Sequence, residues 1–280
     1  MWKLEKPLLD DAIRDIKKII AESGGVISSA EGNTLSYIYR LYDRGQGYIH
    51  PSDNDRCSTE VQDTLYNMYK QKTYEGQKLY YIRKELFKLA DICPMCGIGE
   101  PSQLDHQLPR SIYKSLSLCR LNLVPVCSMC NNKKKDKDST RFIHPYYQEF
   151  PNGKMFLVAN IHINEKKHVV SWKYEFDVHG IDDKLREKIH YQASVIKLLR
   201  RIQKASNSFV SEMFYCSTFQ SPKALKRFLQ NEFNKKTHLY GLNDWRTVLL
   251  HALFTSPKFG VEEAIYLAGK CKPFNRGANA

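Results

Sequence analysis

Apolar residues recur every three or four positions near the N-terminus, which is the spacing of one face of a helix. This pattern predicts four helices, over residues 8–22, 35–43, 58–70 and 74–90. Gly24-Gly25 favours termination of the first helix, and Ser58 is a suitable N-cap for the third. Residues 1–90 are therefore expected to form a helical region.

The pattern changes after residue 150. Residues 155–164 and 168–176 are rich in β-branched and aromatic side chains, and the three residues between them, EKK, are typical of a turn. These two segments are predicted to pair as a β-hairpin. Helical spacing then returns in four segments, 182–206, 222–236, 245–254 and 261–269.

The predicted helix over 182–206 carries four cations on one face, because they follow one another at helical spacing. They are Lys197, Arg200, Arg201 and Lys204. Two interpretations stay open for this face: it is solvated, or it contacts phosphates.

Composition narrows the class of protein. The chain has 280 residues, 42% of them hydrophobic and 26% charged, which is ordinary for a folded globular protein. It contains no apolar run long enough to span a membrane, and its first residues lack the apolar core of a signal peptide. We expect neither a membrane span nor a signal peptide.

The net charge of +13 favours a polyanionic partner, either nucleic acid or an anionic membrane, over a purely solubilising role. The positive charge is uneven. Residues 182–236 hold 12 Lys and Arg against 5 Asp and Glu, so much of it lies in the C-terminal half.

Eight cysteines divide into two groups. Two Cys-x-x-Cys pairs, Cys93 with Cys96 and Cys127 with Cys130, have the pattern of a tetrahedral four-sulfur zinc site. A redox Cys-x-x-Cys is the alternative, but two pairs at this separation fit it poorly. Such a zinc has no open coordination position, so we expect it to be structural.

The other four cysteines are scattered along the chain: Cys57, Cys119, Cys216 and Cys271. They are expected to be free thiols, as in a reducing compartment. The chain is therefore predicted to be cytoplasmic.

Between the cysteine pairs, Leu104-Asp105-His106 is typical of a short strand, and residues 122–127 are predicted to form a returning strand. A helix is expected from Cys130 onward. Strand, loop, strand and helix around a metal make up the ββα-metal arrangement.

This segment, from Cys93 to Lys137, resembles an HNH endonuclease of the subgroup with a four-cysteine zinc in the motif. The similarity lies in the order of a Cys-x-x-Cys, Asp-His, NLVP and Cys-x-x-Cys-Asn followed by lysines. The stretches DHQLPRSIY, NLVPVCSMCNNKKKD and FIHPYY also resemble HNH proteins of Septu-like bacterial anti-phage systems. That second resemblance implies a role in antiviral defence and an ATPase partner encoded nearby.

The HNH resemblance assigns a role to each matching residue. His106 corresponds to the general base, Asp105 and Asn131 to ligands of a catalytic divalent ion, and Asn122 to the residue that braces the loop and orients His106. Many relatives have histidine where this chain has Asn131. A carboxylate and an amide oxygen favour a hard ion, Mg²⁺ or Mn²⁺.

Several cations near the motif are candidate phosphate contacts. Lys133, Lys134 and Lys135 follow Asn131 and are either a solvated run or phosphate ligands. Arg110 and His144 are further candidates.

The sequence thus predicts an α+β, mainly helical protein with a central ββα-metal (HNH) module that bears a zinc ribbon, and a β-hairpin after it. Its regions are 1–90, helical; 91–150, the nuclease module; and 151–280, the hairpin and a basic helical region. The predicted function is metal-dependent cleavage of DNA. The alternatives are a zinc protein that binds nucleic acid without cutting it, or a nuclease that cuts RNA.

Overall fold

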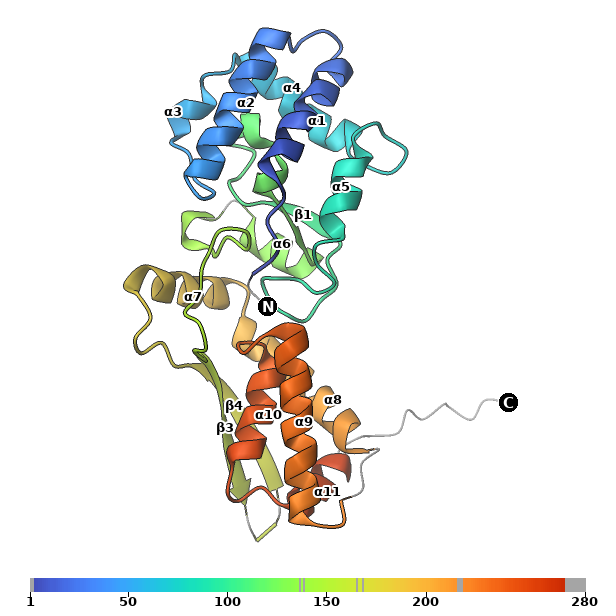
Figure 1. Cartoon of the computed structure of the whole chain (residues 1–280), viewed down its shortest axis with the longest axis vertical. Helices are drawn as coiled ribbons and strands as arrows, with labels where there is room; N and C mark the ends of the chain where they lie inside the picture. The colour runs from blue at the N-terminus through green and yellow to red at the C-terminus, as the bar shows by residue number, and fades with distance from the viewer. Residues whose placement is uncertain are drawn as a thin grey trace, which may run out of the picture. The chain divides into compact units, whose positions relative to one another are not determined.

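The computed structural model describes residues 3–135, 137, 139–164, 166–167, 169–215 and 219–269 (Figure 1). Within those ranges the chain forms two compact units. The first unit contains the residues up to 150 together with 182–196, and the second contains 151–181 together with the residues from 197 onward. The predicted α+β, mainly helical class is confirmed.

The first unit begins with five helices. They are α1 (Leu9–Glu22), α2 (Ser29–Arg44), α3 (Pro51–Asn54), α4 (Thr59–Lys72) and α5 (Tyr80–Phe87). Predicted helices 8–22 and 58–70 agree with α1 and α4. α2 begins earlier than predicted because Ser28 and Glu31 form a capping box. α5 is shorter than the predicted 74–90, and the short α3 was not predicted.

One hydrophobic core joins these helices to the cysteine-rich segment. Ile16 and Leu35 of the N-terminal helices belong to the same buried cluster as Leu104, Leu121 and Leu123. The predicted boundary between residues 90 and 91 falls inside this core.

The cysteine-rich segment has the predicted ββα order. β1 (Gln103–His106) pairs antiparallel with β2 (Leu123–Val126), and α6 (Ser128–Lys134) follows. Two short 3-10 turns, η1 (Lys114–Leu116) and η2 (Arg120–Asn122), lie in the loop between the strands, and a third, η3 (Ser139–Arg141), follows α6. The loop returns the chain so that Asp105 lies opposite Val124.

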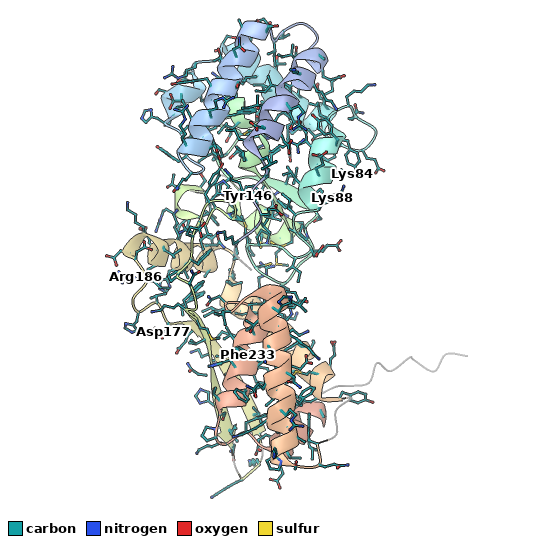
Figure 2. All side chains as sticks on the ribbon, in the orientation of Figure 1. Lys84, Lys88, Tyr146, Asp177, Arg186 and Phe233 are labelled. Atoms are coloured by element: carbon teal, nitrogen blue, oxygen red, sulfur yellow. The ribbon has the colours of Figure 1, made fainter. Side chains whose placement is uncertain are left out.

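Two further hydrogen bonds link the cysteine-rich segment to later parts of the chain. The Tyr146 hydroxyl, labelled in Figure 2, donates a 2.8 Å hydrogen bond to the carbonyl of Leu123. α7 (Asp183–Val195) also belongs to the first unit, and its Gln192 side chain donates to the carbonyl of Met95 at 3.4 Å.

The second unit holds the predicted hairpin, formed by β3 (Leu157–Asn164) and β4 (Val169–Phe176). Val170, Trp172 and Tyr174 point to one buried face, because successive side chains of a strand point to opposite faces. The indole of Trp172 donates to the Ser206 hydroxyl at 2.8 Å, which joins the hairpin to the helices. Those helices are α8 (Leu198–Tyr215), α9 (Pro222–Tyr240), α10 (Trp245–Thr255) and α11 (Val261–Gly269).

The predicted single helix over 182–206 is wrong. The chain breaks between α7 and α8, where Lys197 has a φ of 53°. α7 packs in the first unit and α8 in the second, so tertiary packing overrides a continuous helical pattern. No helix in the described part of the chain is long and apolar enough to cross a membrane.

Candidate active site and metal centre

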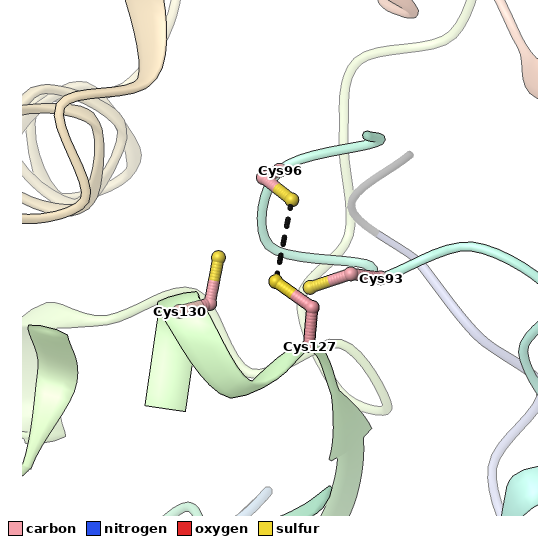
Figure 3. A group of neighbouring side chains, drawn as sticks. All are labelled: Cys93, Cys96, Cys127 and Cys130. Atoms are coloured by element: carbon pink, nitrogen blue, oxygen red, sulfur yellow. Dashed lines mark hydrogen bonds between the residues drawn. The ribbon is translucent and has the colours of Figure 1, made fainter. Parts of the chain in front are cut away.

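The four predicted zinc ligands come together. The sulfur atoms of Cys93, Cys96, Cys127 and Cys130 all lie within 4.8 Å of one another, and the four residues are buried (Figure 3). Two thiolates that each lie about 2.3 Å from zinc at tetrahedral angles are about 3.8 Å apart. The Sγ atoms of Cys96 and Cys127 are 3.8 Å apart. The cluster therefore fits a zinc ion, as the sequence predicted.

Local backbone geometry builds this cluster. Gly97 has a φ of 61°, which lets the backbone turn after the first Cys-x-x-Cys pair. The Gly97 amide donates to the Cys93 carbonyl at 2.8 Å. A Cβ at Gly99 would lie 2.9 Å from the Cβ of Cys127, so only glycine fits where the two turns meet. Cys127 is the N-cap of α6, and a zinc ion would tie this helix to the first turn.

Two of the scattered cysteines, Cys57 and Cys119, are buried free thiols. Cys216 and Cys271 lie outside the described residues.

Beside the cysteine cluster, β1 and α6 help to line a pocket of about 430 Å³. Asp105, His106 and Asn131, the residues expected to hold and use a catalytic ion, all face it. The full lining is Tyr69, Tyr74, Arg83, Ser102, Gln103, Leu104, Asp105, His106, Pro109, Arg110, Asn131 and Lys135.

His106 is held in one tautomer. Its Nε2 lies 3.0 Å from the carbonyl oxygen of Ser117. A carbonyl oxygen only accepts, so Nε2 carries the proton and Nδ1 keeps a free lone pair. The His106 ring also packs edge-on against the Tyr69 ring, with centroids 4.5 Å apart.

Burial lowers the pKa of His106 to about 3. The cationic groups of Arg110, Lys134 and Arg83 lower this pKa further, while the Ser117 carbonyl opposes them. The imidazole is therefore neutral at physiological pH, which a general base requires.

Asp105 is buried and paired with a lysine. Its Oδ2 accepts a 2.7 Å hydrogen bond from the Lys134 amine, and both side chains are almost fully inaccessible to solvent. Burial raises the pKa of Asp105, and the Lys134 charge partly offsets that effect. Lys134 also donates to the carbonyls of His106 and Gln107. The prediction that Lys134 is solvated or contacts phosphate is wrong, because its amine is used inside the protein.

Asn131 makes a second contact between α6 and β1, close to the Lys134–Asp105 pair in both elements. Its Nδ2 donates to the Gln103 Oε1 at 2.7 Å. Gln103 and Asp105 are two positions apart on β1 and point to the same face. Asn131 and Lys134 are likewise one helical turn apart on α6. Two side-chain contacts thus fix α6 against β1: Asn131 with Gln103, and Lys134 with Asp105.

This donor set fits a hard divalent ion. Asp105 and Asn131 both line the pocket, and their side chains carry one carboxylate and one amide oxygen. Mg²⁺ is typically held by one or two carboxylates and completed by waters and substrate phosphates.

Asn122 is fully buried and bridges the loop between the strands. Its Oδ1 accepts from the Leu108 amide at 2.8 Å, and its Nδ2 donates to the Leu108 carbonyl at 3.1 Å. The Tyr42 hydroxyl donates to the same Oδ1 at 3.0 Å. These contacts place Asn122 where it can hold the loop that follows His106.

His144 does not reach the pocket. It is 6% exposed, and its Nε2 lies 2.9 Å from the Tyr42 hydroxyl. Burial lowers the pKa of His144 to about 3. The prediction that His144 contacts phosphate is therefore wrong, because the side chain is part of the internal network around Asn122.

The remaining predicted phosphate contacts have different surroundings. Arg110 and Lys135 line the pocket. Lys133 is half-buried and does not line it. In the second unit, Arg200, Arg201 and Lys204 lie on α8, whereas Lys197 precedes it, so the predicted four-cation helix face is only partly formed.

Sequence reasoning missed Arg83, Tyr69 and Tyr74, which α4, α5 and the turn between them bring to the pocket. One signal was available. Arg83 occupies a position of the apolar face of α5, between Ile82 and Leu86. A cation at such a position has a buried environment and needs a specific partner.

Comparison with known proteins agrees with this geometry. Residues 93–137 match the family model for HNH endonuclease. The chain is also 26% identical over 201 residues to Protein ea31 of Escherichia phage lambda. That alignment covers 64% of this chain and 67% of the phage protein. No solved structure matches the chain. Residues 93–137 are called the HNH domain below.

Proposed function

We propose that this protein is a metal-dependent endonuclease that hydrolyses phosphodiester bonds in DNA. The observation that carries the proposal is the pocket itself. It is lined by a neutral His106, whose Nδ1 keeps its lone pair, and by Asp105 and Asn131, which carry oxygen ligands. A zinc ribbon that only binds nucleic acid has no need of this combination.

In the proposed reaction, His106 Nδ1 accepts a proton from a water molecule as the water oxygen bonds to phosphorus. The bond from phosphorus to the 3′-oxygen breaks and a solvent water protonates that oxygen, which leaves a 3′-hydroxyl and a 5′-phosphate. The proton held by His106 then passes to solvent. Asp105 and Asn131 would hold Mg²⁺ or Mn²⁺, which supplies stabilisation of the charge that develops on the phosphate and the departing oxygen. The Ser117 carbonyl holds the imidazole in the required tautomer throughout.

The zinc would take no part in this chemistry. Its four sulfur ligands leave no open position, and its role would be to fix α6, which carries Asn131, against the start of the HNH domain.

Relaxation of a supercoiled plasmid tests the proposal. We expect cleavage with Mg²⁺ or Mn²⁺ and none with a chelator, and we expect His106→Ala to lower the cleavage rate about 10²–10⁴-fold. Unchanged cleavage by His106→Ala would contradict the mechanism. Retention of DNA without cleavage under either metal would favour the binding alternative. Faster cleavage of RNA than of DNA would favour the RNA alternative.

We also propose a role in anti-phage defence with an ATPase partner, a proposal that rests on the Septu-like resemblance of the HNH segment. Purification of the protein from its native operon tests it. An ATPase that co-purifies supports this role, and a nuclease that is fully active on its own, without a partner, contradicts it.

A further inference from the structure

Two arginines of the first unit are equally buried but have opposite surroundings. Arg120 is 5% exposed and forms ion pairs with both Asp15 and Glu85. Arg83 is 8% exposed and, among the described residues, has no carboxylate partner. A buried guanidinium without a counter-charge is strongly unfavourable, so Arg83 is expected to have an anionic ligand.

The contacts of Arg83 hold it in position but leave most of its donors unused. Its Nη2 donates to the Tyr69 hydroxyl at 3.3 Å, and its guanidinium lies 4.4 Å from the Tyr74 ring centroid. The buried Nε has no hydrogen-bond partner in the described part of the chain. The side chain lines the same pocket as His106.

Arg110 completes the group from the loop that follows β1. Its guanidinium lies 4.3 Å from the Tyr66 ring and 5.0 Å from the Tyr69 ring, and Nη1 donates to the Tyr66 carbonyl. The described residues provide no carboxylate partner for Arg110 either. Both arginines are thus oriented by aromatic rings and keep donors available.

The acidic group of the pocket does not neutralise them. Asp105 is the one carboxylate in the pocket lining, and Lys134 already pairs with it. Arg83, Arg110 and Lys135 therefore leave the pocket with an excess of positive charge. The guanidinium geometry suits the paired oxygen atoms of a phosphate.

We propose that Arg83 and Arg110 form a phosphate-binding subsite, which takes a backbone phosphate of the nucleic-acid strand that enters the pocket. This inference rests on the proposed function for the nature of the ligand. It means that α4, α5 and the HNH domain form one binding site, although the residues matched by the family model begin only at Cys93.

The test measures the affinity of the full-length protein for a labelled DNA duplex as a function of salt, in a His106→Ala background that prevents cleavage. Each phosphate contact contributes about 0.9 to the slope of log affinity against log salt. We expect Arg83→Met and Arg110→Met each to lower the slope by about 0.9 and to weaken binding about tenfold. Arg83→Lys keeps the charge, so we expect it to keep the slope.

Arg56→Met is the matched control, because Arg56 is half-exposed, pairs with Asp53 and does not line the pocket. It should leave the slope unchanged. Arg83→Met should also keep or raise the unfolding temperature, because it removes an unpaired buried charge. If Arg83→Met does not fold, Arg110→Met and Arg83→Lys carry the test.

An unchanged slope in Arg110→Met and Arg83→Met, or an equal drop in Arg56→Met, would overturn the subsite. These outcomes are separate from the fate of the proposed function. A lowered slope in a protein that never cuts DNA would keep the subsite and remove the nuclease. Normal cleavage by the wild-type protein, with unaltered salt slopes in the arginine variants, would keep the nuclease and remove the subsite.

Discussion

Lys134 illustrates how one residue can be misassigned from its neighbours in sequence. It stands in a run of three lysines after Asn131, where a phosphate contact is a natural expectation. In the fold it is 1% exposed, and its amine pairs with Asp105. The helical turn between Asn131 and Lys134 decides this outcome, because it directs both side chains of α6 towards β1.

Lys134→Met should therefore leave a buried carboxylate without a partner. We expect a loss of about 3–5 kcal/mol of unfolding free energy, since breaking a buried ion pair strands the remaining charge. Denaturant unfolding measures this loss. Lys133→Met is the matched control and should change stability little, because Lys133 forms no ion pair with any of the described residues. Equal stability of the two variants would contradict the role of Lys134.

Two tyrosines on α2 offer a second comparison, since both are fully buried. The Tyr42 hydroxyl joins Asn122 to His144. The Tyr39 hydroxyl has no hydrogen-bond partner among the described residues. Tyr42→Phe should lower the unfolding free energy by about 1–3 kcal/mol because it leaves buried polar groups unsatisfied.

Thermal unfolding of both variants measures this difference. Tyr39→Phe should show no loss of stability, because it removes a hydroxyl that is already unpaired. A loss as large as that of Tyr42→Phe would mean that the network through Asn122 adds nothing to stability.

At the scale of elements, the sequence predicted those structures that depend on residues close together in the chain. The cysteine spacing, the Asp-His strand and the β-hairpin were predicted correctly because each depends on neighbouring residues. The break between α7 and α8 was not predictable in this way. The apolar spacing continues through Lys197, and only the packing of the two helices in different units separates them.

The folding of β1, β2 and α6 in the HNH domain should depend on bound zinc. Structural zinc binding supplies about 10–16 kcal/mol, comparable with the total stability of a domain. Cys96→Ser is expected to lose bound zinc and to unfold β1, β2 and α6. Elemental analysis and thermal unfolding measure these effects.

Cys57→Ser is the matched control, since Cys57 is equally buried but lies outside the cluster. It should retain a full complement of zinc. A Cys96→Ser protein that keeps its zinc and its unfolding temperature would contradict the four-cysteine site.

At the scale of the whole molecule, the pocket assembles residues that are far apart in sequence. The motif was enough to propose roles for His106 and Asn131, but not for Arg83, because the place of Arg83 beside the pocket depends on how α5 packs on the HNH domain. The family match covers residues 93–137 and so leaves this wall of the pocket out. The net charge of +13 indicated a polyanion without indicating where it binds.

The second unit offers a test of that wider charge. Lys197, Arg200 and Lys204 are exposed, and the described residues form no ion pair with them. If this surface contacts DNA, replacing all three with glutamine should lower the salt slope of binding by about 2.7. An unchanged slope would mean that the surface is only solvated, as the alternative interpretation holds.

The most direct test of the central claim is the rate of plasmid cleavage with Mg²⁺ by His106→Ala and His162→Ala, measured side by side. His162 is an exposed histidine on β3, and its replacement should leave the wild-type rate unchanged. Loss of the general base should lower the rate about 10²–10⁴-fold in His106→Ala. Equal rates in the two variants would contradict the assignment of the pocket as a nuclease site.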